Sequence, residues 1–181
     1  MASRVQHIDV GQIVLASRPA VGPFLAINTA ANLVTGCLLR ADRKDEDGDK
    51  IDAATIEKAA YRWAEAGGPS RPVLAEHDGP RLRDVLIVQW GVAPAESPLV
   101  IYGTAGAAIP PGAWFAQLQC GPATMARIQK GELTGFSVEG TAVVKSLSDD
   151  EEFEIDVTDL AYAVVAGIRQ GLGLRLVAGR S

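Results

Sequence analysis

The sequence predicts an α+β domain that is rich in antiparallel strands, and three observations support this prediction. Short segments of branched and aromatic residues recur along the chain, separated by turns of Gly, Pro and charged residues. One segment, residues 52–66, has the apolar spacing of an amphipathic helix. The chain has few βαβ cues, which favours an antiparallel barrel or sheet with helices appended to it.

The composition favours one soluble globular domain over residues 1–181, with 48% hydrophobic and 22% charged residues. The net charge of −5 does not favour a nucleic-acid surface. No apolar run has the length of a membrane span, and the amino terminus lacks the apolar block of a secretory signal. Cys37 and Cys120 stand far apart in apolar segments, as buried free thiols of a reducing compartment do. We therefore expect a cytosolic protein that binds neither nucleic acid nor membrane.

The amino-terminal part of the chain predicts little regular structure before residue 24. Residues 1–23 are expected to be a loose extension, in which the apolar run Ile13–Ala16 could form an outlying strand. The core is expected to span about residues 24–178. Its first two strands are predicted at Phe24–Ile27 and Leu33–Leu39.

The helix that follows has clear boundary signals. Asp52 is a suitable N-cap, and Gly67-Gly68-Pro69 ends the helix after about Ala66. An apolar stripe at helical spacing predicts the core-facing side: Ile56, Ala59, Ala60, Trp63 and Ala64.

Strands and loops are predicted over most of the remaining chain. Further strands are predicted at Val73–Glu76, Arg83–Gly91, Ala113–Cys120, from Leu133 to about Leu147, and at Leu174–Val177. Glu152–Ala166 is predicted as a strand that passes into a helix or a second strand. Four prolines and three glycines make Ala93–Gly112 a long loop. A short helix is predicted from Pro122 to Lys130, with Gly131 as its left-handed stop.

The segment Lys130-Gly-Glu-Leu-Thr-Gly-Phe-Ser-Val-Glu-Gly-Thr141 carries the first candidate for chemistry. Alternation along the strand puts Ser137 and Glu139 on one face, and Phe136 and Val138 on the other. Three glycines bracket the serine, and glycine lets a backbone or a substrate approach closely. Ser137 is therefore a small hydroxyl with room in front of it, although most strand serines simply face solvent.

A serine nucleophile needs a general base, and the sequence offers two histidines. His7 lies in the expected loose terminus, where a solvated side chain is the simpler interpretation. His77 follows a predicted strand, between Glu76 and Asp78. An imidazole at this position is either a surface side chain or the group that takes the serine proton, with a third residue holding the ring. Two histidines and two cysteines at these separations form no recognisable metal ligand set, and no cofactor is expected.

These motifs together resemble the XkdF-type phage proteases. The resemblance rests on the serine segment and on further motifs in the family's order: Asp45-Glu-Asp-Gly-Asp49, the helix Ala54–Trp63, Glu76-His77 and Pro111-Gly-Ala-Trp114. It covers roughly residues 34–145, with a fainter match to about residue 178. The group is similar to the tailed-phage prohead proteases and, more distantly, to the herpesvirus assemblin proteases. The resemblance implies an assemblin-type β-barrel with appended helices.

The resemblance also implies roles for individual residues. Ser137 matches the nucleophile and His77 the catalytic histidine. The herpesvirus enzymes use a second histidine, which aligns at about Asp159 or Leu160, and Asp159 is the residue expected to orient His77. The other carboxylates that could take this role are Glu139, Asp156 and Glu154. The same alignment nominates Arg169, with the amides of its loop, as the stabiliser of the oxyanion.

The function implied is that of a serine endopeptidase of phage-head maturation. Its substrates would be scaffold and capsid proteins inside an assembling procapsid, in the host cytoplasm. Because the herpesvirus relatives are dimers, a homodimer is also implied. Two alternatives remain: a protease-like domain without activity that serves as a structural or scaffold-associated head protein, and an unrelated β-rich binding module in which Ser137 is incidental.

Overall fold

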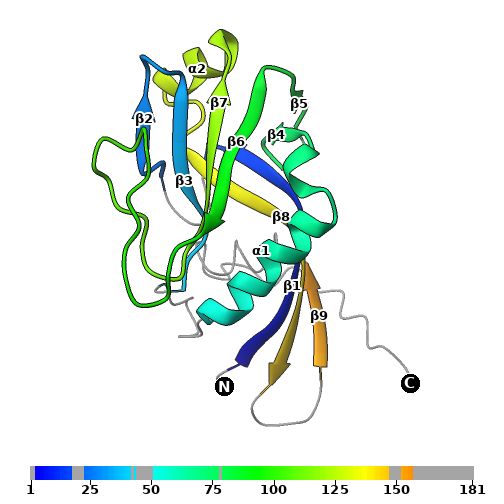
Figure 1. The fold of residues 1–181 in the computed structure, drawn as a ribbon. Coiled ribbons are helices and arrows are strands. Elements are labelled where there is room, and N and C mark those ends of the chain that lie inside the picture. The colour runs from blue at the N-terminus through cyan, green and yellow to red at the C-terminus, as the bar shows by residue number, and fades with distance from the viewer. Residues whose placement is uncertain are drawn as a thin grey trace.

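The computed structural model describes residues 3–17, 23–41, 43, 51–77, 79–146 and 152–156 of the chain. Two α-helices, one 3₁₀ turn and nine strands are assigned within these residues (Figure 1). In chain order they are β1 (Ser3–Ala16), β2 (Ala26–Asn28), β3 (Leu33–Leu39), α1 (Ala53–Glu65), η1 (Gly68–Ser70), β4 (Val73–Ala75), β5 (Arg81–Leu82), β6 (Val85–Val92), β7 (Trp114–Cys120), α2 (Pro122–Gln129), β8 (Gly135–Ser146) and β9 (Glu152–Asp156). The predicted elements beyond residue 156 lie outside the described residues.

The strands form two sheets, one with the order β5-β4-β1-β8-β9 and the other with the order β2-β3-β7-β6. The pairings are antiparallel except that of β1 with β4. No strand pairing in the described residues joins the two sheets, although Pro23, just before β2, forms an isolated bridge with Gly135 of β8. The α+β class is confirmed, but the predicted closed barrel is wrong, because the two sheets face each other across a packed core instead of closing on themselves.

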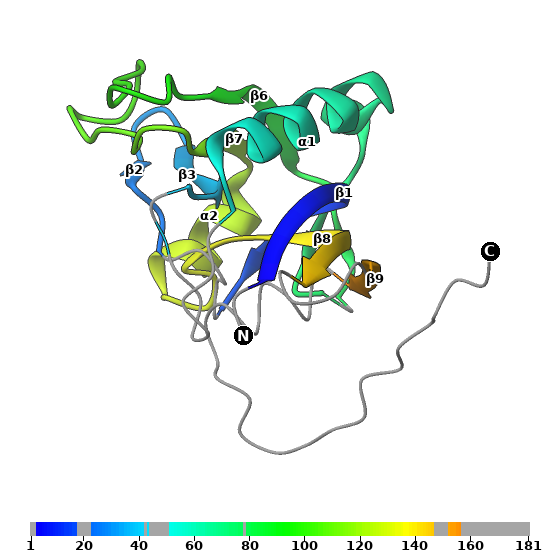
Figure 2. The same cartoon turned by 90° about the horizontal axis from the view of Figure 1, so that it is seen from below.

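The main core lies between the two sheets and under α1. Figure 2 shows α1, β6 and β7 on one side of this core and β1 and β8 on the other. The side chains of Trp63 and Trp114 pack edge to face at 5.3 Å between ring centroids, and Trp63 contacts Trp90 in the same way at 5.6 Å. The core is filled by side chains from all three layers, including Ile56 from α1, Leu118 from β7 and Phe136 from β8.

The amino-terminal strand β1 corrects the prediction of a loose extension. It pairs with β8 along its whole length, from Ser3 opposite Ser146 to Ala16 opposite Gly135. A register shift between Val10 and Gln12 explains why the sequence pattern concealed this strand. The bulge at Gly11 changes the phase of alternation, so that the buried core residues are Ile8 and Val10 before it and Ile13 and Leu15 after it.

The helix boundaries follow local signals, as predicted. Asp52 caps α1 by accepting a hydrogen bond from the Thr55 N–H at 2.8 Å, and the predicted apolar stripe packs on the core. At the start of α2 the cap comes from another part of the chain. The Asp84 carboxylate accepts hydrogen bonds from the Thr124 N–H at 3.1 Å and the Thr124 hydroxyl at 2.6 Å. Burial raises the pKa of Asp84, but hydrogen bonds from Thr124 and from the backbone of Asp84 and Ala123 together outweigh burial, so the pKa lies below its ordinary value.

The long loop between β6 and β7 belongs to the fold. It packs on the face of β3 and β7 that points away from the main core, in a second apolar cluster: Cys37, Ala93, Ile109, Ala113 and Phe115. The buried Gln117 amide donates to the Thr35 hydroxyl at 3.0 Å and to the Tyr102 carbonyl at 2.8 Å, which fastens the loop to this face. Neither described helix has the length and apolarity that a membrane crossing requires.

Candidate active site

Ser137 lies on β8 with its side chain directed away from the main core. Its neighbours Phe136 and Val138 are core residues, so alternation turns Ser137 to the other face of the sheet. Phe136 fixes this part of the strand, because its ring packs edge to face on Phe24 at 5.1 Å. Ser137 stands opposite Val14 of β1, and both residues are fully buried at 0% exposure.

His77 lies at the tip of the hairpin formed by β4 and β5. Leu74 pairs with Arg81, and the Ala75 N–H donates to the Pro80 carbonyl at 3.0 Å. The tip is tight: a Cβ on Gly79 would lie 1.4 Å from the Ala75 carbonyl oxygen, so glycine is required there. His77 is half-buried.

The hairpin and the serine strand meet through β1, which lies between them. Leu74 of β4, Val14 of β1 and Ser137 of β8 occupy one row across the sheet. His77 follows Leu74 by three residues, and its imidazole reaches across β1 to β8. Its Nε2 lies 3.0 Å from the Ser137 Oγ, so the structure brings together the two residues that the sequence analysis paired.

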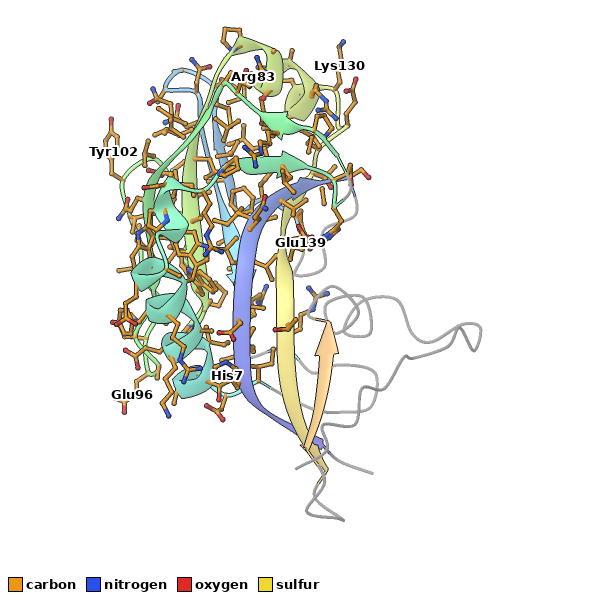
Figure 3. All side chains as sticks on the ribbon, turned by 90° about the vertical axis from the view of Figure 1, so that its right-hand side faces the viewer. His7, Arg83, Glu96, Tyr102, Lys130 and Glu139 are labelled. Carbon is orange, nitrogen blue, oxygen red and sulfur yellow. The ribbon has the colours of Figure 1, made fainter. Side chains whose placement is uncertain are left out.

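The contact has the geometry that general-base chemistry requires. With Nε2 unprotonated, the Ser137 hydroxyl donates its hydrogen bond to the imidazole, which can then take the proton as Oγ attacks an electrophile. The other histidine is placed elsewhere. His7 stands opposite Val143 on β8, and its Nε2 lies 2.9 Å from the Asp9 carboxylate. Figure 3 shows His7 beside α1, away from Glu139.

The candidates for the third member are only partly placed. Glu139 shares the face of Ser137 but stands opposite Gln12, two residues from Val14 and away from the end of β1 that carries the His77 hairpin (Figure 3). No hydrogen bond joins its carboxylate to His77 within the described chain. The backbones of Asp156 and Glu154 lie opposite Thr141 and Val143, four and six residues along β8 from Ser137. Asp159 and Arg169, with Leu160, lie outside the described residues.

The residues that connect the hairpin to the serine strand were not predicted from the sequence. Val14 lies between the two, and Glu76 contacts the end of β1 through its backbone and its carboxylate. Val14 sits in an apolar run, where nothing distinguishes it from a core residue. Glu76 was noted as a neighbour of His77, but its backbone conformation has no signal in the sequence.

Comparison with known proteins matches the chain to one family model and to a bacterial relative. The model of a family described as "Putative phage serine protease XkdF" matches residues 23–159, a segment that contains both His77 and Ser137. A protein of Bacillus subtilis (strain 168) described as "Uncharacterized protein YqbD" is 32% identical over 110 residues, which cover 61% of this chain and 31% of that relative. The chain thus matches about a third of the length of this curated relative. No solved structure matches.

Proposed function

Because the chain belongs to the phage serine protease XkdF family, we propose that it is a serine endopeptidase of phage-head maturation. The observation that supports this most strongly is the 3.0 Å contact between the His77 Nε2 and the Ser137 Oγ. A serine hydroxyl and an imidazole in contact form the reactive core of serine proteases on several unrelated folds.

The proposed reaction proceeds through an acyl-enzyme. His77 takes the Ser137 proton as Oγ attacks the carbonyl carbon of the scissile peptide, and the imidazolium then gives that proton to the leaving amine as the C–N bond breaks. A water molecule next attacks the ester carbonyl and transfers a proton to His77, which returns it to Oγ as the acid product leaves. Help of this kind contributes about 10²–10⁴-fold to the rate.

The remaining parts of the proposal rest on the family resemblance. Asp159 is the proposed residue that orients His77, with Glu139 and Asp156 as alternatives, and Arg169 is the proposed donor to the oxyanion. The proposed substrates are scaffold and internal head proteins, cut inside the procapsid in the host cytoplasm. A homodimer and a kinship with the assemblin proteases belong to the same proposal.

One observation favours a second candidate, a protease-like head protein without activity. Ser137 is completely buried, so a scissile peptide reaches its Oγ only if the atoms that cover it are displaced. A protein that keeps this conformation would serve the head as a structural component.

Co-expression with the phage scaffold protein separates the two candidates. The wild type should cut the scaffold, whereas Ser137→Ala and His77→Ala should leave it intact. Ser70→Ala is the matched control, because it makes the same chemical change at an exposed serine of η1 and should cut normally. An intact scaffold with every variant supports the structural role, and cleavage by Ser137→Ala excludes the proposed nucleophile.

A further inference from the structure

Glu76, the residue before His77, has a backbone conformation that glutamate rarely adopts. Its φ is +63°, in the left-handed region. For a residue other than Gly or Asn, this conformation raises the free energy by about 1–2 kcal/mol, because Cβ approaches the following carbonyl oxygen. Such residues persist where the surrounding structure holds them, and they gather at functional sites.

The contacts that hold Glu76 use its N–H, its carbonyl and its carboxylate. The Glu76 N–H donates to the Leu15 carbonyl at 2.9 Å, and the Gly79 N–H donates to the Glu76 carbonyl at 3.2 Å. The Glu76 Oε1 accepts a hydrogen bond from the Ser17 N–H at 2.9 Å. The backbone and the side chain of Glu76 thus bind the end of β1 through Leu15 and Ser17, the two neighbours of Ala16.

These contacts matter because the strand pairing between the hairpin and the sheet is short, although Val73 and Leu82 also pack on the main core. β4 pairs with β1 through two residue pairs, those of Val14 with Leu74 and Leu15 with Ala75. By contrast, β1 is fixed to β8 over twelve pairs that include Val14 with Ser137. The position of His77 relative to Ser137 therefore depends on how the hairpin is attached to the end of β1.

We infer that Glu76 is a positioning residue, whose carboxylate and left-handed backbone fix the His77 hairpin on β1 and keep the imidazole within hydrogen-bonding distance of the Ser137 hydroxyl. The inference rests on the proposed function for its effect on the rate, but the geometry is independent of catalysis. The carboxylate oxygen that bonds Ser17 is directed to β1, so Glu76 acts on the reaction only through His77.

Three variants separate the carboxylate from the backbone. Glu76→Gln keeps an oxygen that can accept the Ser17 N–H, Glu76→Ala removes the acceptor, and Glu76→Gly removes it while relieving the left-handed strain. Glu132→Ala is the control, since it removes an exposed glutamate that bonds only Arg127, at 3.2 Å, among the described residues. The first readout is the rate at which a fluorophosphonate labels Ser137.

Glu76→Ala should lower the labelling rate about tenfold, the effect of losing one well-placed hydrogen bond to a charged group. Glu76→Gln should stay within about twofold of the wild type, since the amide oxygen can replace the carboxylate oxygen. Glu76→Gly should be labelled as slowly as Glu76→Ala, because both variants lack the carboxylate that accepts the Ser17 N–H. Equal rates for Glu76→Ala and the wild type would overturn the inference, as would an equal loss in Glu76→Gln and Glu76→Ala.

A second readout does not depend on activity. The ring resonances of His77, followed by NMR, should move toward those of a solvent-exposed histidine in Glu76→Ala and stay near the wild-type positions in Glu76→Gln and Glu132→Ala. If the wild type is not labelled at all, the proposed function fails, and this measurement still decides the inference. Unchanged His77 resonances in Glu76→Ala would show that Glu76 does not position the ring.

Discussion

Replacing Gly79 by Ala should remove His77 from Ser137 while leaving the protein folded. The added Cβ would lie 1.4 Å from the Ala75 carbonyl oxygen, and real Cβ atoms stay at least 3.0 Å away, so the two must separate by about 1.6 Å. If His77 moves by the same amount, the distance between its Nε2 and the Ser137 Oγ, now 3.0 Å, will exceed hydrogen-bonding range. Because a misplacement of about 1 Å can cost about 100-fold in rate, the labelling of Ser137 should fall by at least that factor.

The stability cost should be modest. The hairpin tip holds two backbone hydrogen bonds, Gly79 to Glu76 and Ala75 to Pro80, which together are worth about 1–3 kcal/mol. None of the four residues that form these two bonds belongs to the main core between the sheets, so the variant should remain folded.

The assay is the time course of fluorophosphonate labelling, with a thermal melt followed by circular dichroism. Gly106→Ala is the control: an added Cβ would meet nothing within 4 Å, so it makes the same Gly-to-Ala change in a loop without a clash, although its φ of +86° adds a left-handed strain that Gly79 does not have. It should be labelled at the wild-type rate. Wild-type labelling of a folded Gly79→Ala protein would refute the argument that this hairpin sets the position of the base.

Three further predictions concern the fold that supports the site. Asp84→Ala should lower the stability by about 1–2 kcal/mol through loss of the Thr124 cap. Since the folded-state pKa of Asp84 lies below 3.8, this contribution is present above that pH and is lost as the pH falls through the folded pKa, so melts of variant and wild type should converge in strong acid; a constant difference would contradict this. Burial, with the charge of Asp84, raises the pKa of Cys120 to about 12, so iodoacetamide at neutral pH should label this thiol only after denaturation. Gly36→Ala puts a Cβ 2.8 Å from the Phe136 ring and should cost about 1–3 kcal/mol in urea unfolding, and wild-type stability would contradict this packing.

Local signals in the sequence predicted the helices well. The α1 cap at Asp52 and the stripe through Ile56 and Trp63 lie within a few turns of each other, so no distant part of the chain is needed to recognise them. The strand Leu33–Leu39 was predicted with the bounds that the structure has, because its branched residues are bracketed by turn residues. The left-handed stop at Gly131, with φ +73°, followed from the same kind of local signal.

Features that depend on distant pairing were not predictable in this way. The bulge at Gly11 divides the apolar pattern of β1 into two phases, so a central strand resembles an irregular terminus. The row formed by Leu74, Val14 and Ser137 joins three segments, and no spacing in the sequence encodes it. The family motifs supplied His77 and Ser137 as a pair, but not the strand that lies between them.

The central claim is that the His77 imidazole activates the Ser137 hydroxyl. Its most direct test is to react the folded wild type and His77→Ala with a fluorophosphonate and to locate the modified residue by peptide mass spectrometry. We expect one modified serine, Ser137, in the wild type and a loss of at least about 100-fold in the labelling rate for His77→Ala. Modification of several exposed serines in place of Ser137, or equal rates with and without the imidazole, would contradict it.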